Sequence, residues 1–310
     1  MSSAEEPKPV RPATSGFAIA SLVCGLLALI LVLPLLGSLL ALVFGLMALV
    51  RINGSAGLQK GKGLAAAGMA SGGLAILLLP CAVLVLLPAV IGARDATRRN
   101  VSQRNMYILG RAAINYEAIN RKFPPAGEGS NGERHRVSWR VLILPNLGEE
   151  ALYYRFLAAG ANGEFPEWDD PAIEGLAEGI PEFFRNPNQS WAANETNYLA
   201  VTGPGTIYDP EQFPRAAGVD DIYRGDGPAH TAWLVEADAD QVVPWHAPRD
   251  WKFDPNDPKR GLGNFRPGGF LVLFADGHTQ FISNNTDPAV LRAMMTLAGG
   301  EAVDGVSNPW

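Results

Sequence analysis

Two long stretches of the sequence lack charge. Residues 17–50 and residues 64–93 hold 34 and 30 residues without Asp, Glu, Lys or Arg. Because a helix of roughly 20 apolar residues is long enough to cross a bilayer, these stretches exclude a chain that lies wholly in water. We therefore expect the N-terminal part of the chain to anchor the protein in a lipid bilayer.

Cysteine and histidine are scarce. The two cysteines, Cys24 and Cys81, fall in the uncharged stretches, and the four histidines all lie after residue 94. The region from residue 94 onward therefore has no disulfide and no cysteine-based metal or redox site. It also lacks a Gly-x-Ser-x-Gly motif and a His-Glu-x-x-His motif. We predict that the protein is not an enzyme and has no cofactor, with calcium as the one ion to consider.

Basic residues are outnumbered after residue 94. This region holds 20 basic and 29 acidic residues, a net charge of -9, together with all seven Trp and all seven Tyr. Phosphate recognition needs clustered Lys and Arg, so the composition excludes nucleic acid as a partner. We expect an acidic, aromatic-bearing domain that faces water.

The lengths of the uncharged stretches predict a multi-pass anchor. Residues 17–50 are too long for one ordinary crossing, and Pro34 and Gly37 lie near their middle, where a helix breaks most easily. We favour a hairpin of two short crossings, with one long tilted helix as the alternative. Residues 64–93 predict a further helix. Small residues recur at four-residue spacing, which favours close helix packing within this protein; the alternative is that small residues are simply common in membrane helices. They are Gly37, Ala41, Gly45, Gly68 and Gly72.

The loop between the uncharged stretches predicts the orientation. Residues 51–63 contain no acid and three basic residues, Arg51, Lys60 and Lys62. The positive-inside bias places this loop in the cytoplasm of a bacterial cell and the domain after Ala93 outside the cytoplasmic membrane. The predicted parts are a disordered cytoplasmic tail, a transmembrane region and an extracytoplasmic domain, at residues 1–16, 17–93 and 94–310.

The sequence of the extracytoplasmic domain predicts an α+β fold. Apolar residues recur at helical spacing over residues 94–120, and Pro124-Pro125 ends the pattern, so one long helix should run from the membrane into the domain. Asp276-Gly277 separates two apolar runs and predicts a β-hairpin whose two central residues have positive φ. Residues 138–144 fit a strand or a buried helical turn. Further strands are expected at residues 198–202 and 233–236, and long surface loops at residues 208–228 and 244–263.

Two families resemble parts of this chain. Residues 16–23 and 61–68 resemble the bacterial membrane domain known as domain of unknown function, family 4190. Residues 80–301 resemble the bacterial pseudopilin-like family known as domain of unknown function, family 1559, which carries a prepilin-processing-associated His-x9-Asp-Gly signature. The matching stretches are 86–90, 93–99, 123–126, 138–145, 197–206, 235–237, 267–270 and 274–277.

The second resemblance implies a pilin-like fold, with one long helix packed on a mainly antiparallel sheet. It also implies a structural or assembly role at the cell envelope, through lateral self-association or contact with envelope proteins. Asp276 and Gly277 form the end of the signature, whereas Arg266 stands where its His would be. Asn186 stands where the family often has a cysteine, and the family's prepilin leader is missing.

Acidic residues are the basis for predicting a calcium site. Glu236, Asp238 and Asp240 alternate, so on a strand their carboxylates would share a face and gather calcium. The alternative is a solvated acidic edge. A second acidic group lies in a Gly-containing loop: Asp220, Asp221 and Asp226.

Other side chains have both a functional and a structural interpretation. A hydrolase would use Asp276 and His278, although the Asp-Gly turn already explains most of that motif. Aromatic and histidine side chains in the loops would stack on a glycan or peptide, or else pack onto the core: His230, Trp245, His246 and Trp251. His135 fits a solvated position, and Gly203-Pro204-Gly205 fits a turn. A binding module for a glycan, peptide or calcium is therefore the alternative function.

Overall fold

The computed structural model describes residues 13–30, 34–55, 59–126, 136–213 and 216–297. His135 and residues 1–12 of the predicted tail lie outside the described residues. The chain divides into two compact units, Met1–Asp95 and Ala96–Trp310. One helix, α3, begins at Lys62 and ends at Asn120, so both units contain part of it.

The first unit consists of apolar helices. The predicted break near Pro34 is confirmed, because α1 (Gly16–Ile30) and α2 (Pro34–Gly54) are separate helices that pack on each other. Two short strands, β1 (Ala13–Thr14) and β2 (Gln59–Lys60), pair in parallel. Within the described residues one helix, Leu36–Gly54, is long and apolar enough to cross a membrane, and shorter apolar helices lie at Gly16–Leu27 and Lys62–Leu78.

Small residues allow the helix backbones of this unit to approach closely. A Cβ atom added to Gly68 of α3 would lie 2.5 Å from the carbonyl carbon of Ser21 in α1. A Cβ atom on Gly72 would lie 3.1 Å from the carbonyl oxygen of Ser38 in α2. The Ser21 hydroxyl donates a hydrogen bond of 2.8 Å to the carbonyl oxygen of Ala41. The predicted small-residue packing within this protein is therefore confirmed.

The second unit contains a five-stranded mixed sheet with the order β7-β4-β5-β8-β9. Its neighbours are antiparallel except for β4 and β7, which run in parallel. The strands are β4 (Tyr198–Thr202), β5 (Ala232–Glu236), β7 (Trp251–Lys252), β8 (Gly269–Phe274) and β9 (Thr279–Ser283). The strands predicted at residues 198–202 and 233–236 are thus confirmed. A separate antiparallel pair joins β3 (Glu195–Thr196) to β6 (Val243–Pro244).

Both faces of the sheet are covered. Alternate residues of a strand point to opposite faces, so β4 and β5 contribute to both core clusters. On one face, Ala200 and Leu234 belong to a core cluster that includes Met106 and Leu109 of α3. On the other face, Leu199 and Val235 belong to a cluster completed by residues of α8 (Pro288–Met295). The α+β class is confirmed, and α8 adds a layer that was not predicted.

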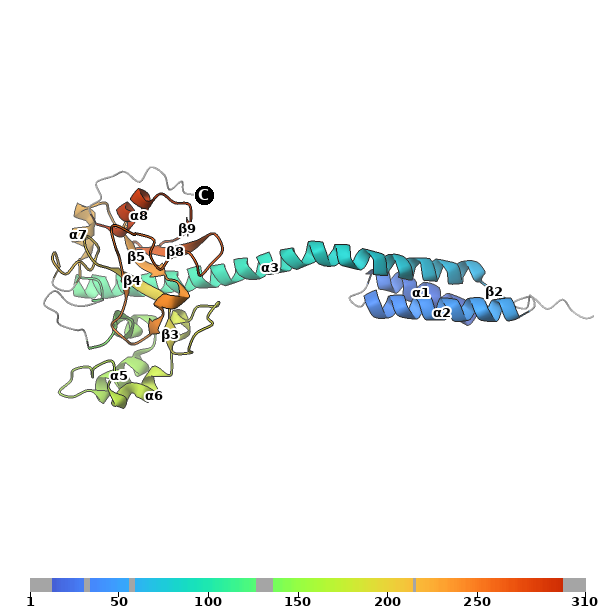
Figure 1. Ribbon diagram of the computed structural model, residues 1–310. Helices are drawn as coiled ribbons and strands as arrows, with labels where there is room; N and C mark the ends of the chain where they lie inside the picture. The colour runs from blue at the N-terminus through green and yellow to red at the C-terminus, as the bar shows by residue number, and fades with distance from the viewer. Residues whose placement is uncertain (1–12, 31–33, 56–58, 127–135, 214–215, 298–310) are drawn as a thin grey trace, which may run out of the picture. The chain divides into compact units, whose positions relative to one another are not determined.

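Short helices and turns complete the second unit around the sheet (Figure 1). The helical alternative for residues 138–144 is the correct one, because α4 (Trp139–Leu142) and the first residue of the 3-10 helix η1 (Leu144–Leu147) occupy most of them. The segment predicted as a loop at residues 208–228 contains a helix, α7, and the one at residues 244–263 contains β7. These elements are α4 (Trp139–Leu142), η1 (Leu144–Leu147), α5 (Glu150–Ala159), η2 (Pro171–Ile173), α6 (Glu174–Ala177), η3 (Glu182–Phe184), α7 (Val219–Arg224) and η4 (Ala239–Gln241).

The predicted hairpin joins β8 to β9, but its turn differs from the expected one. Gly277 has φ of 91°, whereas Asp276 has no positive φ. The Phe274 carbonyl accepts from the Gly277 amide at 2.9 Å, and the Phe274 amide donates to the His278 carbonyl at 2.9 Å. A three-residue connection of this kind needs the left-handed conformation at its last residue alone. The expectation of two positive φ angles was therefore wrong.

Candidate functional site: a cavity beside the edge strand

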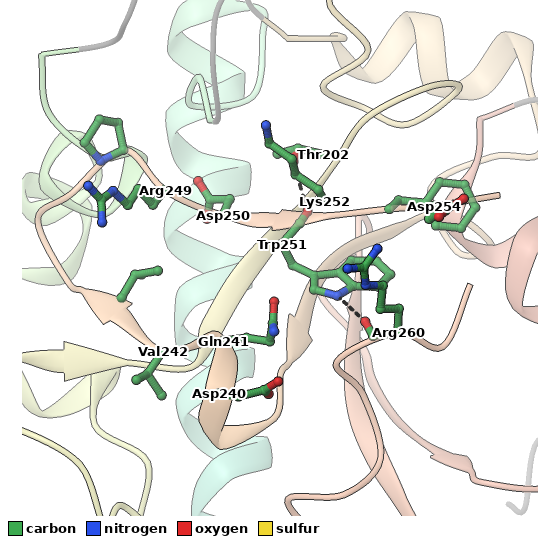
Figure 2. A pocket seen from close by; sticks show the side chains of 13 residues that line it. Thr202, Asp240, Gln241, Val242, Arg249, Asp250, Trp251, Lys252, Asp254 and Arg260 are labelled. Carbon is green, nitrogen blue, oxygen red and sulfur yellow. Dashed lines mark hydrogen bonds between the residues drawn. The ribbon is translucent and has the colours of Figure 1, made fainter. Parts of the chain in front are cut away.

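A cavity of about 770 Å³ lies along β7 (Figure 2). Its walls come from Thr202 of β4, from residues 240–243, from β7 and the residues that flank it, and from Arg260. Figure 2 shows Lys252 and Trp251 leaving β7 in opposite directions, with Gln241 and Asp240 across from the strand. Pockets that bind small molecules commonly occupy about 300–1,000 Å³, so this cavity has the size of a ligand site.

The strand β7 forms one edge of the sheet. On its inner side, the Thr202 hydroxyl donates to the Trp251 carbonyl at 2.9 Å, and the Phe253 amide donates to the Thr202 carbonyl at 2.8 Å. Peptide groups alternate in direction along an extended strand. The amide and carbonyl of Lys252 therefore point away from β4, toward the open side of the edge.

A buried ion pair occupies the edge of β4 before β7 begins. Arg140 and Asp250 have fully buried side chains, joined by a contact of 2.9 Å. The Arg140 guanidinium donates to the Tyr198 carbonyl at 2.8 Å, and the Ala200 amide donates to Asp250 at 2.9 Å. These two side chains therefore satisfy backbone groups that a neighbouring strand would otherwise pair.

The pair is held in turn by its surroundings. The Trp139 indole donates to the same Asp250 oxygen at 3.0 Å, and the Ser138 hydroxyl accepts from the Arg140 guanidinium at 2.7 Å. Burial lowers the pKa of Arg140, and the Asp250 carboxylate opposes that shift. A buried guanidinium requires such a partner, because an unpaired charge in the interior is strongly destabilising.

Three cationic side chains at the cavity are exposed: Arg249, Lys252 and Arg260. The Arg249 guanidinium lies 4.6 Å from the centre of the Trp168 ring. Among the acidic lining residues, Asp250 pairs with Arg140, and Asp254 accepts the amide of Asn256 at 2.9 Å.

The three carboxylates of the calcium hypothesis do not converge. Glu236 is buried and forms an ion pair with Arg266, with 2.5 Å between the Arg266 Nε and the Glu236 Oε2. Asp238 accepts from the amides of Asn264 and Phe265 at 2.7 and 2.8 Å. Asp240 is exposed and lines the cavity. In the part of the chain that the structure describes, no three His, Cys, Asp or Glu side chains form a group suited to a metal ion. The calcium site stays a prediction without support from these contacts.

The two residues that depart from the family pattern meet at Glu236. Arg266 donates to both of its carboxylate oxygens, and the Asn186 amide donates to one of them at 2.6 Å. Arg266 also donates to the Ser102 hydroxyl of α3 at 2.7 Å, and the Tyr198 hydroxyl donates to the same oxygen at 3.0 Å. Burial raises the pKa of Tyr198 well above its usual value, so this hydroxyl stays protonated as a donor. The network joins α3 to the sheet.

The second acidic group belongs to the start of α7. Asp221 accepts from the Gly218 amide at 3.0 Å and from Arg224 at 3.0 Å, which is a capping arrangement at a helix N-terminus. Asp220 is exposed beside it, and the Asp226 amide donates to the Leu297 carbonyl at 2.9 Å. These contacts explain Asp221 as part of the local fold.

The Asp276 and His278 side chains are in contact at the hairpin. The His278 Nδ1 lies 2.6 Å from the Asp276 carboxylate, and the His278 amide donates to the same oxygen at 3.0 Å. Partial burial raises the pKa of Asp276, but the hydrogen bonds from His278 outweigh it, and the pKa falls below its usual value. The imidazole stacks on Phe274 with 4.4 Å between ring centres. The arrangement stabilises the turn.

The loop aromatics are part of the core. Trp245 is fully buried and donates to the Ala177 carbonyl at 2.9 Å, and Trp251 is also buried. His246 is buried, which lowers its pKa, while His230 is exposed. Residues 203–205 form a turn, in which the Gly203 carbonyl accepts from the Thr206 amide at 3.2 Å.

Comparison with known families covers the first half of the chain. Residues 17–92 match the family model described as Domain of unknown function (DUF4190), and residues 92–161 match the one described as Protein of unknown function (DUF1559). The two matching models are those of the two expected families, in the expected order. The second match ends before Arg266 and Asp276, so it does not include the signature. No curated protein and no solved structure matches the chain.

The sequence did not reveal the cavity as a site. Of the residues predicted to carry function, Asp240 and Trp251 line it, but its cations were not singled out. One signal was available, because Arg140 interrupts the apolar run at residues 138–144 and a charge there calls for a buried partner. Nothing in the sequence points to Asp250 as that partner, since 110 positions separate the two residues.

Proposed function

We propose that this protein is a non-enzymatic anchor of the bacterial cytoplasmic membrane, with a pilin-like domain that has a structural or assembly role at the cell envelope. One observation carries the proposal: α3 (Lys62–Asn120) contributes its first part to the apolar unit and its last part to the core of the α+β unit. A single helix with these two environments joins a membrane anchor to a water-facing domain.

The outer surface of α2 supports membrane insertion. Its exposed side chains include many large apolar ones, and among the described residues this helix is the one both long and apolar enough to cross a bilayer. Leu36, Leu46 and Val50 are 59%, 62% and 67% exposed. Large apolar surfaces of this kind are rare in water and normal against lipid. We place α1, α2 and the start of α3 in the membrane and the domain outside, as the basic loop at residues 51–63 favours.

Protease accessibility tests this orientation. Trypsin added to intact spheroplasts that express the full chain should digest the domain after Arg94 and leave the apolar unit protected. The same digestion in permeabilised cells provides the control for intrinsic cleavability. Full protection of the domain in intact spheroplasts would contradict the orientation.

Cross-linking tests the assembly role. In a chain with Cys24 and Cys81 replaced by Ser, Tyr107→Cys places a thiol on α3 and Tyr223→Cys places one on α7; both tyrosines are exposed. Lateral packing of α3 should give disulfide-linked dimers through position 107 and few through position 223. Equal dimer yields at the two positions would argue against assembly through α3.

The cavity beside β7 favours a second candidate, an extracytoplasmic binding module. Its volume of about 770 Å³ and its mixture of charged and apolar lining residues suit a ligand. A thermal-shift screen of the full chain in detergent, with peptides, glycans and calcium, tests this candidate. Stabilisation by one of these ligand classes supports it, and no stabilisation by any of them contradicts it.

A further inference from the structure

We propose that the cavity beside β7 binds an extended peptide with acidic side chains, which pairs with β7 as an added strand. This inference rests on the second candidate function, the binding module, and specifies its ligand. It does not depend on the orientation in the membrane. Three features of the second unit support it: the direction of the Lys252 peptide groups, the room beside them, and the charge around that room.

The edge of the sheet offers backbone partners. β7 is the terminal strand, and its bonds to Thr202 leave the Lys252 amide and carbonyl directed outward. An extended peptide that lies beside an edge strand forms hydrogen bonds with such groups. The edge of β4 that precedes β7 is already closed by Arg140 and Asp250, so an added strand would pair at Lys252.

The cavity provides room for the side chains of a strand. It extends from β7 to the segment at residues 240–243, where Val242 and Val243 are half-buried and present apolar surface. Figure 2 shows Val242 and Gln241 on the opposite wall from Lys252. Side chains of an extended peptide alternate between its two faces. Its apolar side chains can therefore contact this wall while its acidic side chains point to the opposite face.

The charge of the cavity selects an acidic peptide. Its lining carries three exposed cations, Arg249, Lys252 and Arg260, against two carboxylates, Asp240 and Asp254, besides the buried Asp250 that Arg140 neutralises. The chain as a whole has a formal charge of -6, whereas the exposed cations of this lining outnumber the two carboxylates by one. A lysine on a short edge strand is also a common protection against self-association. Protection of the edge accounts for Lys252 alone. It does not account for Arg249, Arg260 or the cavity, which fit a ligand.

Short synthetic peptides provide the test. The probe is a fluorescein-labelled peptide of alternating Asp and Val, and its control replaces each Asp with Asn. Fluorescence anisotropy with the full chain in detergent should show binding about tenfold tighter for the Asp peptide, with a difference that shrinks as salt is added. Equal affinity for the two peptides, or no binding of either, would overturn the inference.

Protein variants locate the site. The double substitution Arg249→Gln and Arg260→Gln should weaken binding of the Asp peptide about tenfold. The matched control, Lys122→Gln with Arg155→Gln, removes two exposed charges elsewhere in the same unit and should leave the affinity unchanged. An equal loss in both double variants would show non-specific attraction and overturn the site.

A modified peptide tests strand pairing without any change to the protein. N-methylation of alternate residues of the Asp peptide keeps its charge but blocks one hydrogen-bonding edge. The methylated peptide should bind at least about tenfold more weakly. Unchanged affinity would overturn strand addition. Stabilisation of the chain by a glycan or calcium, without binding of the Asp peptide, would overturn this inference and leave the binding-module candidate standing.

Discussion

The two compact units of this chain hold their elements together by different means. In the first unit, glycines and serines bring helix backbones into contact, and the large apolar side chains point outward. In the second unit, large aromatic side chains fill the interior and two buried ion pairs connect distant segments. With the first unit in lipid, as proposed above, each unit would place its large apolar groups where the surroundings favour them and leave the other side chains for internal contacts.

The ion pairs should contribute the larger single-residue effects. Asp250→Ala removes the acceptor of the Arg140 guanidinium, the Trp139 indole and the Ala200 amide. Because it leaves a buried guanidinium unpaired, we expect the free energy of unfolding of the second unit to fall by about 3–5 kcal/mol. Chemical denaturation followed by tryptophan fluorescence measures it. The control is Asp169→Ala, at an exposed aspartate. A similar small change in both variants would mean that the pair is not what closes the sheet edge.

Substitutions where helix backbones meet in the first unit should cost less stability than loss of an ion pair, and the cost should depend on the position. Gly68→Leu places a side chain against the backbone of Ser21, and overpacking of this kind typically costs about 1–3 kcal/mol. We expect faster hydrogen exchange in α1 (Gly16–Ile30), measured by mass spectrometry in detergent. Gly73→Leu on the same helix is the matched control, because nothing lies within 4 Å of a Cβ atom there. Equal exchange in the two variants would show that α1 does not depend on close approach at Gly68.

A smaller effect concerns how the stability of the second unit depends on pH. Burial lowers the pKa of His246 in the folded second unit. The unfolded chain therefore takes up a proton that the folded unit resists, and stability should fall as the pH drops below about 6.5. His246→Gln should flatten this part of the stability profile, measured by denaturation between neutral and mildly acidic pH. His230→Gln, at an exposed histidine, is the control variant. A slope unchanged in both variants would assign the pH dependence to other groups.

Local signals in the sequence predicted much of the fold. The break at Pro34, the end of the long helix before Pro124, and the hairpin at Asp276-Gly277 each follow from the conformational limits of proline and glycine. By contrast, β7 has two residues in a segment rich in Pro, Gly and Asp, and its strand conformation comes from pairing with β4. The cap at Asp287, followed by Pro288, was a readable start signal for α8 that the sequence interpretation missed.

The candidate site was less predictable because its parts come together only in the fold. The alternation of Glu236, Asp238 and Asp240 suggested a shared face, but β5 ends at Glu236, so the strand geometry behind that inference does not extend to the other two acids. Arg266, which lies in a loop 30 positions further along the chain, donates to the Glu236 carboxylate. Spacing along the chain carries no information on such pairs.

The closure of the β4 edge by Arg140 and Asp250 has a consequence for the order of folding. The two residues are 110 positions apart, and the backbone groups that they satisfy belong to a strand between them. Contacts that close long loops form late and slow the folding of a domain. During synthesis, the edge of β4 therefore lacks the Asp250 side chain until the chain has been made that far, and until then its unpaired backbone groups are open to pairing with another strand.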